Sequence, residues 1–271
     1  MKLKTPNAEH LDVGAGTLEE HPERGGRSFP EGEVYVQKDM RGDNVFVVHS
    51  GLPGPNRSLM YLFGVLERCR EEDLEPYLFS TYFPYMRQDG SFHGSDLNYA
   101  RSLVEKMVEY YGVREIYTLD AHFSERDWTS RFPVENVSAV DLLLEKADSD
   151  IVVGPDRGAA ERFGVKALQK ERRGGEVEVS GEFEVAGEEV LLVDDIVGSG
   201  GTMLEARDRL LEIGADQVSA AVVHGAREEG VRKVAEAFDD LYLTNSVRRD
   251  AANVPVEPLV QEKLNSLEPD F

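Results

Sequence analysis

Short apolar segments alternate with longer amphipathic segments along most of the chain. Apolar runs of roughly four to eight residues predict buried strands, and apolar residues spaced three and four positions apart predict helices. One such helical stripe consists of Leu97, Ala100, Val104, Met107, Val108 and Tyr111. Residues 1–28 show no clear periodicity, so the regular pattern is expected to begin after them.

The pattern predicts a series of alternating strands and helices. Strands are expected over residues 33–37, 44–50, 77–83, 115–123, 151–154, 189–193, 218–225 and 241–245. Helices are expected over residues 57–72, 97–111, 137–147, 159–171, 202–214, 229–238 and 257–267. Strands that alternate with helices are typical of parallel sheets covered on both faces. The sequence therefore predicts an α/β fold with two Rossmann-like halves, each a mainly parallel sheet flanked by helices.

Composition narrows the classes of function. The net charge is −22, and only nine of the 30 basic residues are lysine. Such an acidic chain repels nucleic acid and anionic membranes, so we expect neither as a partner. Acidic residues spread over predicted helix faces also suggest adaptation to high salt. A single cysteine, no apolar stretch of transmembrane length and no secretory signal together predict a cytoplasmic protein.

The segment EVLLVDDIVGSGGTMLEA combines a predicted strand, two acids and a glycine-rich loop. Asp194 and Asp195 are expected at the C-terminal end of the strand, where α/β sheets bind ligands. The loop consists of Gly198, Ser199, Gly200, Gly201 and Thr202. Its glycines let backbone N–H groups and the start of the next helix face an anion. Because adjacent carboxylates can accept hydrogen bonds from vicinal hydroxyls, the segment indicates a ribose 5-phosphate site.

Two familiar glycine-rich motifs fit this loop less well. A Walker A loop requires a Gly-Lys-Ser/Thr sequence, and a dinucleotide fingerprint requires a third glycine where Met203 stands. A plain turn with Thr202 as helix N-cap is the structural alternative. DDIVGSGGT resembles the motif shared by type I phosphoribosyltransferases and ribose-phosphate diphosphokinases.

Residues 83–89, FPYMRQD, resemble the P-Y-x-R-Q-D segment of the diphosphokinases. The resemblance assigns Arg87, Gln88 and Asp89 to ATP binding. Arginine suits that role because its planar, permanent cation pairs with phosphates or stacks on a purine. A surface salt bridge after a strand is the structural alternative.

Residues 29–33, FPEGE, resemble the diphosphokinase turn F-x-D-G-E, with Glu31 in place of the usual aspartate. In that family the turn reaches the adenine site of a neighbouring subunit. The resemblance therefore assigns Phe29, Glu31 and Glu33 to ATP binding. It also implies a homo-oligomer whose adenine site is shared between subunits.

Two strand ends resemble the magnesium-associated positions of the family. Asp120-Ala121-His122 resembles D-L-H, and Pro155-Asp156-Arg157-Gly158 resembles P-D-x-G. The resemblance assigns His122 and Asp156 to a Mg²⁺ site. A structural histidine and an N-cap turn are the alternatives.

Lys170-Glu171-Arg172 precedes a polar stretch that contains glycine and resembles the family's K-x-R catalytic loop. The resemblance gives Lys170 and Arg172 the task of stabilising charge on the transferring group. The alternative is a pair of cations at the C-terminal end of the helix predicted over residues 159–171.

The resemblance covers roughly residues 28–265 and implies two phosphoribosyltransferase-like domains, at residues 1–134 and 135–271. The active site would lie between the two halves, and the last helix can pack back on the N-terminal domain. The implied activity is a kinase-type transferase of nucleotide biosynthesis, which converts ATP and ribose 5-phosphate into phosphoribosyl diphosphate and AMP with Mg²⁺.

Two alternatives remain open from the sequence. A type I phosphoribosyltransferase would share the glycine-rich loop but would not need the RQD, FPEGE and K-x-R segments. A catalytically inert paralogue of the synthetase would be expected to lose Lys170, Arg172 or His122, and all three are present. The segment GSFHGSDLN departs from the family because it lacks Lys and Arg, and Ala121 replaces leucine.

Overall fold

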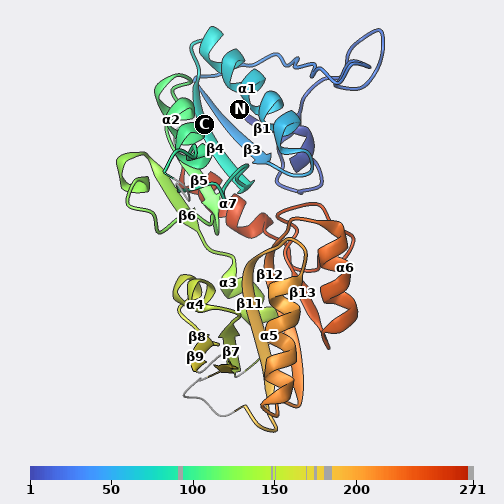
Figure 1. Cartoon of the computed structure of the whole chain (residues 1–271). Coiled ribbons are helices and arrows are strands. Elements are labelled where there is room, and N and C mark those ends of the chain that lie inside the picture. The colour runs from blue at the N-terminus through green and yellow to red at the C-terminus, as the bar shows by residue number, and fades with distance from the viewer. Residues whose placement is uncertain are drawn as a thin grey trace. The chain divides into compact units, whose positions relative to one another are not determined.

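The computed structural model describes residues 1–90, 94–147, 149, 151–168, 170–173, 176–179 and 185–267, with only the backbone for residues 170–173 and 176–179. The chain divides into two compact units. Unit 1 contains Met1–Ser138, Ser246–Arg248 and the segment from Val256 onward, and unit 2 contains Ala139–Asn245 and Arg249–Pro255. Both units combine parallel strands with flanking helices, so the expected α/β class is confirmed (Figure 1).

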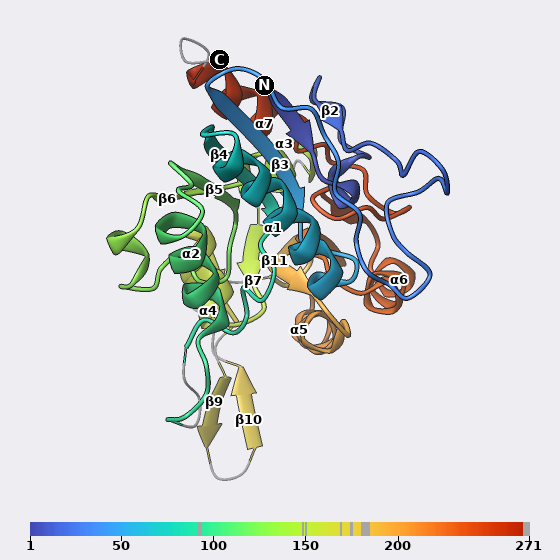
Figure 2. The ribbon, with the colours of Figure 1, turned by 90° about the horizontal axis from the view of Figure 1, so that it is seen from above.

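Unit 1 contains a six-stranded parallel sheet in the order β2-β1-β3-β4-β5-β6. Its strands are β1 (Lys2–Lys4), β2 (Gly16–Thr17), β3 (Asn44–Ser50), β4 (Glu75–Tyr82), β5 (Ile116–Leu119) and β6 (Val134–Val137). Its helices are α1 (Pro55–Glu71), α2 (Tyr99–Glu109) and α7 (Glu257–Ser266), with 3-10 turns η1 (Pro6–Ala8) and η2 (Thr129–Arg131). Figure 2 shows α1 and α2 along the strands of this sheet.

Late segments of the chain complete unit 1. The carbonyl oxygen of Ser246 accepts hydrogen bonds from the hydroxyls of Ser50, at 3.1 Å, and Thr81, at 2.8 Å. On α7, the Lys263 ammonium donates to Glu135 of β6 at 2.6 Å. The ends of β3 and β4 are therefore tied down by a residue that lies far along the chain.

Three expectations for unit 1 need correction. Residues 33–37 form no strand; the bridge Ser28↔Val34 closes a small turn instead. Helix α2 begins at Tyr99, not residue 97, because the Asn98 side chain caps it by accepting from the Arg101 N–H at 2.9 Å. The first 28 residues, which show no periodicity, contribute strands β1 and β2 to the sheet.

Unit 2 contains a five-stranded parallel sheet in the order β13-β12-β11-β7-β8, and an antiparallel hairpin. The sheet strands are β7 (Ile151–Gly154), β8 (Lys166–Ala167), β11 (Glu189–Val197), β12 (Gln217–Gly225) and β13 (Leu241–Leu243). The hairpin strands are β9 (Lys170–Arg173) and β10 (Glu176–Val179). The helices are α3 (Val140–Ala147), α4 (Arg157–Phe163), α5 (Gly201–Glu212) and α6 (Glu228–Ala237).

The helix expected over residues 159–171 is wrong. Helix α4 ends at Phe163, because Gly164 adopts the left-handed conformation with φ +65° and closes the last turn through its N–H group. The chain then pairs with β7 as β8 before it enters the hairpin. Lys170 and Arg172 consequently lie on strand β9, and the alternative that they stand at a helix C-terminus is excluded.

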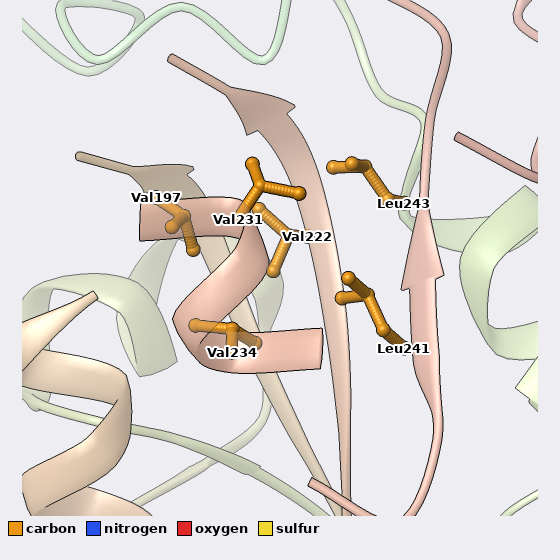
Figure 3. A pocket seen from close by; sticks show the side chains of 6 residues that line it. All are labelled: Val197, Val222, Val231, Val234, Leu241 and Leu243. Carbon is orange, nitrogen blue, oxygen red and sulfur yellow. The ribbon is translucent and has the colours of Figure 1, made fainter. Parts of the chain in front are cut away.

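The core of unit 2 is aliphatic where β11, β12 and β13 meet α6. Figure 3 shows a small pocket in this core, lined by Val197, Val222, Val231, Val234, Leu241 and Leu243. All six lining residues are aliphatic, and the pocket has no room for a water molecule. It is therefore a packing gap beneath the glycine-rich loop that follows Val197, with no polar group to orient a ligand.

Candidate functional site

A tight turn after β4 presents the side chains that are predicted to bind ATP. The Gln88 N–H donates to the Tyr85 carbonyl at 2.8 Å, and Tyr85 adopts a left-handed backbone with φ +60°. Met86 is fully buried beneath the turn, whereas Arg87 and Gln88 are exposed. The turn therefore anchors itself through an apolar residue and leaves the arginine and glutamine available to a ligand.

Asp89 ends this turn and is buried, with no side-chain exposure. Its Oδ2 accepts from Nδ1 of His122 at 3.1 Å and from Nε of Arg126 at 2.9 Å, and its Oδ1 accepts from Nη2 of Arg126 at 3.2 Å. Burial alone would raise the pKa of Asp89, but the hydrogen bonds and positive charge of these partners lower it to about 2. The aspartate is therefore ionised at neutral pH.

Asp89, which the resemblance assigns to ATP binding, is held inside the protein. Its carboxylate binds the side chains of His122 and Arg126, so Asp89 holds these neighbouring groups in place. Arg126, its bidentate partner, was not among the candidate residues. The sequence did not reveal it, because the pair joins positions 37 residues apart.

His122 lies on the loop after β5, where Asp120 adopts a left-handed backbone with φ +36°. The loop is held by the Ser138 hydroxyl, which donates to Asp120 at 2.8 Å, and by Asn136, which accepts from the Ala121 N–H at 2.9 Å. The imidazole is 29% exposed and uses Nδ1 for Asp89. Because an ionised carboxylate only accepts hydrogen bonds, Nδ1 carries a proton, and in the neutral form of the ring Nε2 is the nitrogen with a lone pair.

The FPEGE segment forms a turn, as its resemblance to the F-x-D-G-E turn implies. The Phe29 N–H donates to the Glu33 carbonyl at 2.8 Å, and Gly32 takes φ +95°. The Phe29 ring packs against the rings of His21 and Tyr35, with centroids 5.7 and 6.2 Å away. Glu31 and Glu33 are exposed at the turn.

In unit 2, the glycine-rich loop joins β11 to α5. Gly200 occupies the N-cap position with φ +84° and no side-chain cap, so the alternative of Thr202 as N-cap is wrong. The Ser199 hydroxyl accepts from the Gly201 N–H at 3.4 Å. The first N–H groups of a helix have no acceptors within it, so the start of α5 offers donors to an anion.

Helix α6 supports this loop through a close backbone contact. A Cβ atom placed on Gly230 would lie 1.9 Å from the carbonyl oxygen of Gly198. A Cβ atom on Gly200 would in turn lie 3.2 Å from the carbonyl oxygen of Gly230. Glycine at position 230 therefore lets the loop rest directly on the helix. This residue was not among the candidates drawn from the sequence.

Asp194 and Asp195 lie within β11, which continues four residues beyond the predicted strand to Val197. Asp195 is 6% exposed and forms an ion pair with Arg162 of α4 at 2.6 Å. The carboxylate of Asp194 accepts from the backbone N–H of Asp195 at 2.9 Å. Burial, reinforced by the negative charge of Asp195, raises the pKa of Asp194 well above its usual value. Arg162 thus neutralises one of two adjacent acids.

Asp156 is exposed and caps helix α4, because its Oδ1 accepts from the Ala159 N–H at 2.9 Å. The capping alternative is therefore confirmed, while the second carboxylate oxygen is not used for the cap. The backbone of Lys170 and Arg172 pairs with Val179 and Val177 of β10, and their side chains lie outside the described residues.

The described part of the chain contains neither a cluster of potential metal-ligating side chains nor a membrane-spanning helix. No group of three or more His, Cys, Asp or Glu residues there has the arrangement of a metal site. None of the helices described is both long and apolar enough to cross a bilayer.

Comparisons with known proteins identify relatives over almost the full length. The phosphoribosyl transferase domain family matches residues 138–257. Ribose-phosphate pyrophosphokinase of Thermococcus kodakarensis is 31% identical over 270 residues, which cover 92% of this chain and 93% of the relative. The enzyme of the same name from Methanopyrus kandleri is 32% identical over 288 residues, 98% of this chain and 96% of the relative.

A solved structure agrees with the fold. Phosphoribosylpyrophosphate synthetase from Mycobacterium smegmatis superimposes with a TM-score of 0.80 at 24% identity, covering 100% of this chain and 99% of that protein. The expected fold of two mainly parallel sheets flanked by helices is therefore confirmed. With relatives above 30% identity over nearly all of its length, the chain belongs to the ribose-phosphate pyrophosphokinase family, the diphosphokinases that its motifs resemble.

Proposed function

We propose that this protein transfers the diphosphoryl group of ATP to the anomeric hydroxyl of ribose 5-phosphate, giving phosphoribosyl diphosphate and AMP. The observation that carries the proposal is the full-length similarity to enzymes named ribose-phosphate pyrophosphokinase. The anomeric oxygen attacks the β-phosphorus, the bond from that phosphorus to the AMP oxygen breaks, and the hydroxyl proton is released to solvent. Positioning and charge neutralisation supply most of the catalysis in such transfers.

The glycine-rich loop is the proposed site of ribose 5-phosphate. Backbone N–H groups of Gly198–Thr202 bind the 5-phosphate at the start of α5. Asp194, which is half-buried, exchanges hydrogen bonds with the ribose hydroxyls, while Asp195 is held by Arg162 at 2.6 Å. The ion pair supports a positioning role for Asp195 alongside its proposed contact with the sugar.

The turn after β4 is the proposed site of ATP. Arg87 and Gln88 are exposed there, which supports contacts with phosphates and the purine. Phe29, Glu31 and Glu33 are proposed to reach the adenine site of a neighbouring subunit. Lys170 and Arg172 are proposed to stabilise negative charge as the diphosphoryl group moves.

Magnesium fits this arrangement. Mg²⁺ bound with a nucleotide keeps several waters and takes only one or two protein ligands, so no protein cluster is required. In the neutral form of His122, Nε2 has a lone pair that Asp89 does not use, and Asp156 keeps one carboxylate oxygen outside its cap. Each of these residues is proposed, within its own unit, as a contact for magnesium or its waters, and the ion would neutralise charge on the phosphates.

A direct assay tests the proposed reaction. The purified protein is incubated with ATP, Mg²⁺ and ribose 5-phosphate, and AMP is measured by chromatography. We expect AMP only when the sugar phosphate is present. A phosphoribosyltransferase would instead consume phosphoribosyl diphosphate with a base, and an inert paralogue would give neither product.

The shared adenine site is tested by subunit mixing. Glu33→Ala and Lys170→Ala subunits should each be inactive alone, and exchange between them should restore part of the activity by pairing intact halves. Absence of recovery in verified mixed oligomers would show that each chain builds its own adenine site.

A further inference from the structure

We infer that Arg126 is a positioning residue that acts through Asp89 to fix the orientation of the His122 imidazole. The consequence for catalysis rests on the proposed function, in which His122 serves magnesium bound to ATP. The geometric claim itself depends only on contacts within unit 1.

His122 and Arg126 share one carboxylate. Oδ2 of Asp89 accepts from both Nδ1 of His122, at 3.1 Å, and Nε of Arg126, at 2.9 Å. Nη2 of Arg126 occupies the other oxygen at 3.2 Å. A guanidinium that holds both oxygens fixes the plane of the carboxylate, because its donors lie in a rigid planar fork.

The backbone of Asp89 is held as well. Its carbonyl oxygen accepts from Nδ2 of Asn98 at 2.7 Å and from the indole N–H of Trp128 at 3.3 Å. With its backbone held in this way, Asp89 could still rotate its carboxylate about the bond between Cβ and Cγ. Terminal torsions of this kind are broad in the absence of a partner, so Arg126 supplies the missing restraint.

The fixed carboxylate in turn orients the histidine. A carboxylate with a fixed plane directs the Nδ1–H bond of His122, which selects one tautomer and one ring orientation. Nε2 is then the nitrogen available to a ligand. Asp89 also joins the turn that carries Arg87 and Gln88 to the loop of His122. The residues proposed to bind ATP and the histidine proposed to bind magnesium are therefore held close together.

The exposure of Arg126 argues against a merely structural role. Its side chain is 49% exposed, whereas that of Asp89 is fully buried. Because Arg126 is half-exposed, its removal lets water reach the carboxylate, which also keeps His122 as a partner, so we expect only part of the stabilisation of Asp89 to be lost. Removal of Arg126 should therefore disturb the carboxylate that it holds without unfolding unit 1.

The test compares Arg126→Ala with Arg131→Ala, which removes an exposed arginine from η2 of the same connection between β5 and β6. We expect Arg126→Ala to raise KM for ATP with Mg²⁺ by about 10-fold, as is typical for groups that orient a metal-site histidine. KM for ribose 5-phosphate should not change. Arg131→Ala should match the wild type in both constants.

A double-mutant cycle identifies the route of the effect. If Arg126 acts through the imidazole, Arg126→Ala should add nothing to His122→Ala, whereas independent effects would multiply. Arg126→Lys should recover only part of the loss, because a lysine cannot hold both carboxylate oxygens. Multiplying effects, or full recovery with lysine, would overturn the inference.

Nitrogen-15 NMR of histidine-labelled protein supplies a readout without substrate. In the wild type, we expect the ring nitrogens of His122 to show a single tautomer with the proton on Nδ1. In Arg126→Ala, the two nitrogen signals should move towards each other as tautomers mix, while Arg131→Ala leaves them unchanged. Unchanged signals in Arg126→Ala would refute the positioning role even if the wild type proves to make no AMP.

Discussion

Asp89, His122 and Arg126 form a cluster in unit 1 that we call the Asp89 corner. This corner and the glycine-rich loop of unit 2 hold polar groups in place by opposite means. At the corner, a histidine and an arginine of the connection after β5 share the buried carboxylate of Asp89, which follows β4. At the loop, the absence of side chains at Gly200 and Gly230 lets backbone lie directly on backbone. The corner should therefore respond to changes of charge, and the loop to changes of volume.

The two regions are also proposed to serve different substrates. The corner lies beside the residues proposed to bind ATP, and the loop is the proposed site of the sugar phosphate. Damage to one region should raise KM for one substrate and leave the other unchanged. A residue that acts only in the transition state should change neither value of KM.

The largest expected effect is a loss of kcat in variants of Lys170 and Arg172. These residues belong to neither region, so their variants show what a change outside both regions does to the kinetics. Lys170→Ala and Arg172→Ala should each lower kcat by on the order of 10³–10⁵, since cations that stabilise a transferring phosphoryl group contribute about this much. Steady-state kinetics should show nearly unchanged KM for both substrates. Near-normal kcat in both variants would mean that the K-x-R resemblance carries no catalytic role here.

Replacement of Gly230 tests the volume-sensitive region. In Gly230→Ala the new methyl group would meet the Gly198 carbonyl at 1.9 Å, so the loop must move. We expect KM for ribose 5-phosphate to rise about 10-fold and stability to fall by about 1–3 kcal/mol, as for other overpacked sites. KM for ATP should stay constant.

Gly16→Ala provides the matched control, because its Cβ would meet nothing closer than the Lys2 carbonyl oxygen at 3.7 Å. Kinetics and thermal melts of the two variants separate displacement of the loop from a general effect of removing glycine. An unchanged KM for ribose 5-phosphate in Gly230→Ala would show that the contact with α6 does not shape the phosphate site.

Acid titration tests the charge-sensitive region. The pKa of Asp89 falls from its ordinary value of 3.8 to about 2 in the folded protein, so its ionised form stabilises the fold at pH values above about 4. This contribution is on the order of 1–2 kcal/mol and disappears as the pH falls through 2. Urea unfolding of wild type and Asp89→Asn should show a stability difference that narrows between pH 4 and 2. A difference that stays constant over this range would contradict the charge-based account.

Salt gives the smallest expected effect and tests charge over the whole molecule. At the corner opposite charges attract, whereas over the surface a net charge of −22 repels itself. Screening should therefore raise the melting temperature by a few degrees as KCl reaches molar concentrations. A Tm that stays flat or falls in scanning calorimetry would count against adaptation to high salt.

The sequence predicted those features whose residues are neighbours along the chain. DDIVGSGGT is one continuous segment, so its loop and helix start could be identified without coordinates. Contacts between distant segments could not be predicted from the sequence. Arg126 contacts Asp89, 37 residues away, and Gly230 supports a loop some thirty positions earlier. Helical spacing of apolar residues continued past Gly164, so the pattern missed the end of α4. Strands β1 and β2 were missed because three and two residues are too few to show alternation.

The return of the chain to unit 1 has a consequence for the order in which the protein is made. A ribosome completes all of unit 2 before it adds α7, whose Lys263 binds Glu135 of β6. The Ser246 carbonyl that joins Ser50 to Thr81 also emerges only after nearly all of unit 2. Unit 1, which begins first, is therefore finished last, and the nascent chain carries an incomplete unit 1 until synthesis is almost over.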